Sequence, residues 1–140
     1  MAQYLEGTDQ RSFALGMVNA FAEVVAAGVK PLALSPPLDE ALYEAIKEGS
    51  DAIVADWGVV SCVERDLLES DLFPAEMTRG IIVILYCASR EVLDAYQALK
   101  EERADLVDRG AYEGSQRRAI AERFGRLLGY SEEIIAARLA

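Results

Sequence analysis

Six residues that could contact a ligand follow the apolar stretches of the sequence, at the places where strands are predicted to end. They are Ser35, Asp56, Trp57, Gly58, Ser89 and Arg90. Open parallel α/β sheets bind ligands outside the carboxyl ends of their strands, where helices begin and their backbone N–H groups face a bound anion. These six residues therefore form the predicted ligand-binding site.

Asp56 and Trp57 give this predicted site its chemical character. The carboxylate of Asp56 would orient a hydroxyl or an amine, the indole of Trp57 would stack on a planar ligand, and Gly58 would let the backbone come close. The two serines would add hydrogen bonds, and the arginine would pair with an anion. A structural alternative stays open, because Ser and Asp are favoured at helix N-caps and Trp57 could cover the end of the sheet.

The absence of histidine excludes several kinds of catalysis. The 140 residues contain no His, so Ser–His and Cys–His pairs, His-ligated zinc and a proximal haem histidine are impossible. The sequence also lacks a dinucleotide-binding glycine loop, a P-loop, a calcium loop and a nucleophile elbow. We predict no cofactor and no metal, and a chain without catalytic activity. Catalysis by carboxylates, Lys, Tyr or a thiol stays open.

The cysteine pattern and the N-terminal region suggest where the chain resides. Cys62 and Cys87 match no metal or redox motif, which predicts two reduced, buried thiols and a cytoplasmic protein; a nucleophilic Cys87 is the less favoured alternative. The first ten residues show no signal-peptide pattern. The apolar stretch 12–29 contains Asn19 and Glu23, so we expect a buried or oligomer-forming helix and no membrane span.

The acidic charge is concentrated in the first two thirds of the chain. The net charge is -10, and residues 1–89 carry 5 basic and 14 acidic side chains, whereas residues 90–140 carry 9 and 10. Nucleic acid is not an expected partner, because binding a polyanion requires clustered cations. Glu132 and Glu133, at the start of the last predicted helix, further oppose DNA binding. Around the predicted site, this charge favours a neutral or cationic ligand over an anionic one.

Apolar runs that alternate with helical patterns predict an α/β fold. Strands are expected at residues 30–35, 51–56 and 80–87, and residues 3–5 could add another. Helices are expected at residues 9–27, 38–48, 59–69, 89–108, 115–128 and 131–139. The predicted architecture is a small three-layer sandwich: a narrow, mainly parallel sheet of about three strands, covered by helices, with a helical C-terminal third.

The sequence predicts one domain, residues 1–140, and an interaction role. Residues 1–89 form its acidic α/β part, and residues 90–140 form a helical extension packed on the sheet. The favoured function is a non-catalytic, homo-oligomeric interaction or structural module, because the first helix is apolar around much of its circumference and a narrow sheet leaves two edges to cover. The alternative is a metabolite-binding protein or enzyme with its site around Asp56 and Trp57.

Overall fold

The computed structural model describes residues 6–140, and this range contains six helices and three strands. The helices are α1 (Gln10–Ala26), α2 (Glu40–Trp57), α3 (Ala75–Thr78), α4 (Arg90–Asp108), α5 (Gly114–Leu127) and α6 (Glu132–Leu139). The strands are β1 (Leu32–Leu34), β2 (Val60–Glu64) and β3 (Val83–Cys87). The extra strand that the sequence suggested at residues 3–5 lies outside the described residues.

The sheet is antiparallel, so the prediction of a mainly parallel sheet is wrong. The strand order is β1-β3-β2, and β3 pairs antiparallel with both neighbours. Cys87 of β3 lies opposite Leu32 of β1 and Val60 of β2. β1 and β2 therefore run in the same direction and are joined through α2, but β3 is inserted between them. This split β-α-β arrangement removes every parallel pair that the βαβ rule anticipated.

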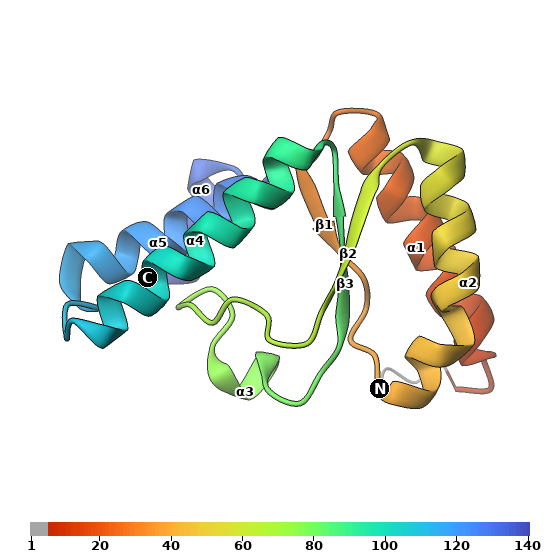
Figure 1. Cartoon of the computed structure of the whole chain (residues 1–140), viewed down its shortest axis with the longest axis horizontal. Helices are drawn as coiled ribbons and strands as arrows, with labels where there is room; N and C mark the ends of the chain where they lie inside the picture. The colour runs from red at the N-terminus through yellow and green to blue at the C-terminus, as the bar shows by residue number, and fades with distance from the viewer. Residues whose placement is uncertain (1–5) are drawn as a thin grey trace.

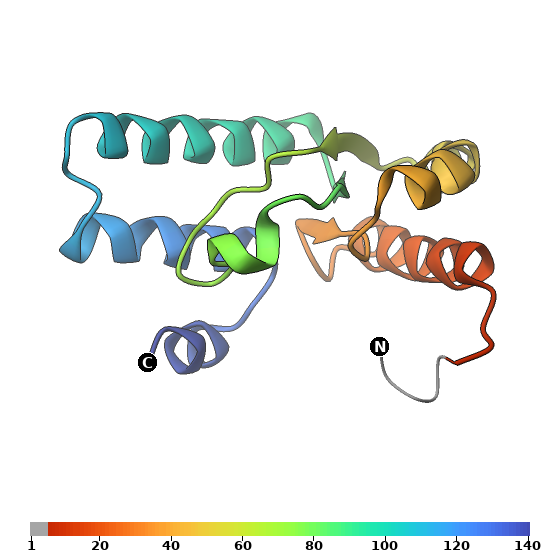
Figure 2. The same cartoon turned by 90° about the horizontal axis from the view of Figure 1, so that it is seen from below.

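Helices cover both faces of the sheet (Figures 1 and 2). α1 and α2 lie against one face, and α4 and α5 lie side by side on the other, with α6 packed on α5. β3 is apolar and is buried along its whole length. Ile82, Ile84 and Tyr86 belong to the core on the α1–α2 side, whereas Val83, Leu85 and Cys87 belong to the core on the α4–α5 side.

Two further predictions, which concern α2 and β2, are wrong. The expected strand 51–56 is the second half of α2, and the expected helix 59–69 contains β2. Gly49, which follows the predicted helix 38–48, is a packing position inside α2: a Cβ there would lie 2.7 Å from Leu15 Cδ2 of α1. The helix instead ends at Gly58, whose φ of 68° is the left-handed conformation that glycine adopts readily.

α1 has the boundaries that its sequence predicts. Asp9 caps the helix by accepting a hydrogen bond from the Ser12 N–H at 3.1 Å. Its buried residues, which include Val18 and Ala22, pack in the core that α1 shares with α2 and the sheet. Within residues 6–140, no helix is both long enough and apolar enough to cross a membrane.

Candidate functional site

The antiparallel sheet distributes the six predicted site residues over both of its ends. Because Leu32 and Val60 both pair with Cys87, Trp57, Gly58, Ser89 and Arg90 lie towards one end. Ser35 follows the last residue of β1 and lies towards the opposite end. A parallel sheet would have placed Ser35 at the same edge as the other residues, and for this reason the sequence predicted a single site.

Three of the four predicted residues that lie towards the first of these ends make side-chain contacts within the chain. Trp57 Nε1 donates to Asn19 Oδ1 at 2.9 Å, which ties the end of α2 to α1, and 39% of Trp57 remains exposed. Ser89 caps α4 by accepting from the Val92 N–H at 3.4 Å, and Arg90 pairs with Asp94 at 3.4 Å. Ser89 thus has the N-cap role that the structural alternative gave it.

Ser35 and Asp56 differ most from each other in environment. The Ser35 hydroxyl is buried, donates to the Pro36 carbonyl and accepts from the Ile84 N–H, both at 2.9 Å. It thereby replaces a backbone acceptor of the β1–β3 ladder. Asp56 lies exposed in the last turn of α2. Ligand binding by the six residues stays a prediction.

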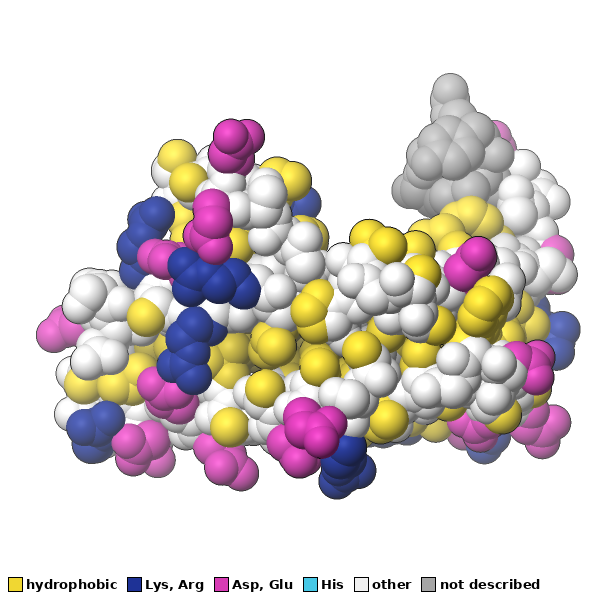
Figure 3. Space-filling view, turned by 90° about the horizontal axis from the view of Figure 1, so that it is seen from above, with side chains coloured by type: hydrophobic (Ala, Val, Ile, Leu, Met, Phe, Trp, Pro, Cys, Tyr) yellow, Lys and Arg dark blue, Asp and Glu magenta, His cyan; other side chains and the backbone are white. Residues whose placement is uncertain are grey.

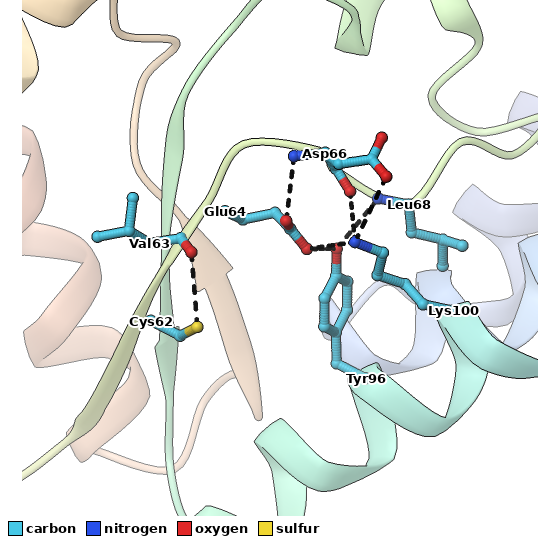
Figure 4. A network of polar contacts seen from close by, with 7 residues as sticks. All are labelled: Cys62, Val63, Glu64, Asp66, Leu68, Tyr96 and Lys100. Carbon is cyan, nitrogen blue, oxygen red and sulfur yellow. Dashed lines mark hydrogen bonds and ion pairs between the residues drawn. The ribbon is translucent and has the colours of Figure 1, made fainter.

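A partly buried polar network forms where β2 meets α4 (Figure 4), and the sequence did not indicate it. Glu64 Oε2 accepts from the Tyr96 hydroxyl at 2.7 Å and from Lys100 Nζ at 2.9 Å. Glu64 Oε1 accepts from the Asp66 N–H at 3.1 Å. The Tyr96 hydroxyl in turn accepts from the Leu68 N–H at 3.0 Å, and Lys100 also donates to the Asp66 carbonyl at 2.6 Å.

The network connects the loop after β2 to α4. Both oxygens of Glu64 and the Tyr96 hydroxyl already have partners. Burial, followed by the hydrogen bond to Glu64, raises the pKa of Tyr96, so the phenol stays protonated. A cleft of about 320 Å³ opens beside it and is bordered by Cys62 and Gln97. The physical role that these contacts support is to fix residues 65–68 against α4.

Removal of the Tyr96 hydroxyl tests this structural role. Tyr96→Phe leaves the Leu68 N–H without a partner and removes one of the two hydrogen bonds that Glu64 Oε2 accepts, and an unsatisfied buried polar group costs about 1–3 kcal/mol. We expect a loss of about 2 kcal/mol in the free energy of unfolding, measured by urea titration. Tyr43→Phe, on the surface of α2, is the matched control and should change the free energy by less than about 0.5 kcal/mol. Equal effects of the two variants would contradict the role.

The two thiols are free, and their environments oppose a nucleophilic role for Cys87. Burial raises the pKa of Cys87 to about 12, the opposite of the shift that activates a thiolate. Cys62 is partly exposed on the outer strand β2, and its Sγ lies 3.6 Å from the Val63 carbonyl oxygen. Within the described part of the chain, no cluster of three or more His, Cys, Asp or Glu residues could hold a metal ion.

The arginines of α5 are paired with carboxylates. Arg118 pairs with Glu122 at 2.8 Å, Arg123 with Glu102 at 2.6 Å and Arg126 with Glu132 at 2.8 Å. Arg117 makes a two-pronged contact with Asp71, which lowers the pKa of that carboxyl. These pairs neutralise the basic helix face on which a nucleic-acid site would depend.

β2 leaves an open edge on the sheet (Figure 2). Hydrogen bonding alternates along an antiparallel strand, and the register places the N–H and C=O groups of Val60, Cys62 and Glu64 towards β3. Those of Ser61 and Val63 therefore point outward, away from the sheet. In Figure 2, β2 lies at the margin of the molecule between α4 and α2. Val63 is 39% exposed.

The sequence of β1 protects the other edge of the sheet from pairing with a further strand. β1 is three residues long, and Pro31 and Pro36 flank it closely. Leu32 is fully buried, so only Leu34 offers outward backbone groups. Short edge strands and edge prolines are devices that prevent strand pairing. β2 carries neither device.

Comparisons with protein-family models, with curated proteins and with solved structures found no match to this chain.

Proposed function

We propose that the chain is a homo-oligomeric interaction module that joins to a second copy through the edge of β2. The observation that carries the proposal is the outward-pointing backbone of Ser61 and Val63 on a five-residue strand without an edge proline. Unpaired N–H and C=O groups in a row are a template for another strand. An antiparallel partner would extend the three-stranded sheet to six strands.

The pattern of donors and acceptors on β2 is self-complementary. A two-fold axis at Cys62 pairs Ser61 with Val63 of the second copy, and Val63 with Ser61 of that copy. Both are hydrogen-bonded pairs, so the N–H and C=O groups of all four residues find partners. This register overlaps the whole strand, Val60–Glu64, and the two Cys62 side chains face each other across the axis.

Net charge opposes this association, and the opposition is testable. Each copy carries a net charge of -10, so two copies repel each other, and salt screens that repulsion. Light scattering after size exclusion should give twice the chain mass of 15.3 kDa, and the dimer should dissociate less at high than at low ionic strength. A mass of 15.3 kDa at high protein concentration, at both low and high ionic strength, would contradict the proposal.

A cytoplasmic location belongs to the same proposal. Both cysteines are unpaired, which is the state expected of thiols in a reducing compartment. Under those conditions the two Cys62 side chains would face each other as thiols, and the backbone pairing would hold the copies together without a disulfide.

A further inference from the structure

An apolar groove lies beside β1 and reaches the start of β3 at Val83. It has a volume of about 270 Å³ and is bordered by α1, by the turn between α5 and α6, and by the segment that leads into α3 and out of it. Its apolar lining includes Phe21, Leu34, Phe73 and Met77. Ser35 also borders the groove, but its hydroxyl is already bonded in both directions. We call this feature the β1 groove.

Lys30 and Tyr130 mark one end of the β1 groove. Lys30 precedes β1, and its ammonium lies 5.8 Å from the centre of the Tyr130 ring. The guanidinium of Arg138, from α6, lies 4.8 Å from the centre of the same ring. Both cations thus lie near one aromatic ring, and of the two only Lys30 lines the groove, whose lining also includes Met77, which is 54% exposed.

The absence of a carboxylate partner for Lys30 and Arg138 is unusual in this molecule. Among the residues that the structure describes, every Lys and Arg forms an ion pair except Arg11, Lys30 and Arg138. Arg11 donates to the Ala45 carbonyl at 3.0 Å. Residues 1–5 contain no Asp or Glu. In a chain with 24 acidic and 14 basic side chains, two cations without an ion pair therefore lie near the ring of Tyr130, which lines the groove together with Lys30.

Partial burial destabilises the charged form of Lys30, and a bound anion would offset this destabilisation. Partial removal from water lowers the pKa of Lys30, since burial disfavours its charged form. A bound carboxylate would restore the favourable environment of the ammonium and would itself be held by charge-assisted hydrogen bonds. Figure 3 views the molecule from the end at which β1 begins; hydrophobic side chains form a band across this face, with charged side chains around it.

We propose that the β1 groove binds a small apolar carboxylic acid, with its carboxylate against Lys30 and Arg138. Its hydrocarbon part lies along β1 towards Met77. Ligand pockets typically combine an apolar lining with a few polar groups that fix orientation, and here the two cations supply the orientation. Local cations reverse, at this one place, the acidic field that disfavours anions elsewhere on the chain. This site is independent of the pairing through β2.

Calorimetric titration of the full chain with octanoate and with octanol tests the proposal. Both probes have the same hydrocarbon length, but only octanoate carries the charge that Lys30 and Arg138 would hold. We expect octanoate to bind at least about tenfold more tightly than octanol, and more tightly than butyrate by a similar factor. An acetylated apolar tripeptide with a free C-terminal carboxylate should bind more weakly than octanoate.

Variants then locate the site. Lys30→Met keeps an unbranched side chain of similar length and should weaken octanoate binding about tenfold while leaving octanol binding unchanged. Lys47→Met, which removes an exposed lysine of α2, is the matched control and should leave both affinities unchanged. Met77→Ser should weaken both ligands. Thermal melting should show that each variant is folded.

Four outcomes would overturn the proposal. They are no binding of octanoate, equal affinities for octanoate and octanol, equal effects of Lys30→Met and Lys47→Met, and tighter binding of the tripeptide than of octanoate. The last outcome would assign the groove to the end of a protein chain instead of a free acid.

Discussion

Val63→Pro is expected to convert the dimer into a monomer without unfolding the chain. The Val63 N–H points away from β3, so proline at this position removes no hydrogen bond within the chain. In the dimer, proline removes the N–H at position 63 that donates to Ser61 of the second copy. The two-fold axis repeats this loss, so two hydrogen bonds disappear, and each proline ring would contact the partner strand. Two lost hydrogen bonds and this steric conflict should weaken association at least about 100-fold.

Val63→Thr is the matched control for this substitution. Threonine keeps the branched shape and the backbone N–H, so the dimer should persist. Concentration-dependent light scattering measures both variants, and thermal melting checks that each is folded. A folded Val63→Pro chain that stays dimeric would show that the copies associate through another surface.

Phe124→Ala should have the largest effect on stability. Phe124 of α5 is fully buried, and its ring lies 5.6 Å from that of Phe73 and 5.8 Å from that of Tyr96. It therefore joins α5 to α4 and to the loop that precedes α3. Truncation of a buried phenylalanine to alanine costs about 3–5 kcal/mol, and urea unfolding should show a loss in that range.

Ile134→Ala is the control for this loss. Ile134 lies on α6 and is 47% exposed, so its truncation should cost less than about 1 kcal/mol. Similar losses for the two variants would mean that the α4–α5 side of the sheet is not packed around Phe124.

The elements with long, regular patterns could be predicted from the sequence. α1, α4, α5 and α6 begin and end close to the predicted residues, and β3 matches the most apolar run of the chain. Local signals set these boundaries, such as the caps at Asp9 and Ser89. Each depends on interactions within a few residues, which is the range that a single sequence reveals.

α2 and β2 could not be assigned from local pattern because short apolar runs fit either a helix or a strand. Gly49 resembles a helix end, yet its place in the helix depends on the close approach of Leu15 from α1. The valines at positions 59, 60 and 63, which favour strands, are the signal that could have identified β2, but the sequence Val60-Ser61-Cys62-Val63-Glu64 has no regular alternation. The antiparallel direction depends on β3 entering between two strands that precede it.

The sites outside the predicted set join residues that are far apart in sequence. Glu64 meets Tyr96 and Lys100 only when β2 lies beside α4, and Lys30 meets Tyr130 only when the α5–α6 turn reaches the start of β1. No spacing rule links such positions. Ser35, by contrast, was selected as a ligand contact, and it lies at the rim of the β1 groove as part of the β1–β3 ladder.

Oxidative cross-linking of Cys62 tests the pairing of β2 with a second copy most directly. In the proposed register the two Cys62 residues form a non-hydrogen-bonded pair, with Cα atoms about 4.5 Å apart, which lies within the range that a disulfide spans. Mild oxidation should yield a disulfide-linked dimer of twice 15.3 kDa, and Cys62→Ser or Val63→Pro should prevent it. An oxidised chain that remains at 15.3 kDa, or a dimer linked through Cys87, would contradict the account.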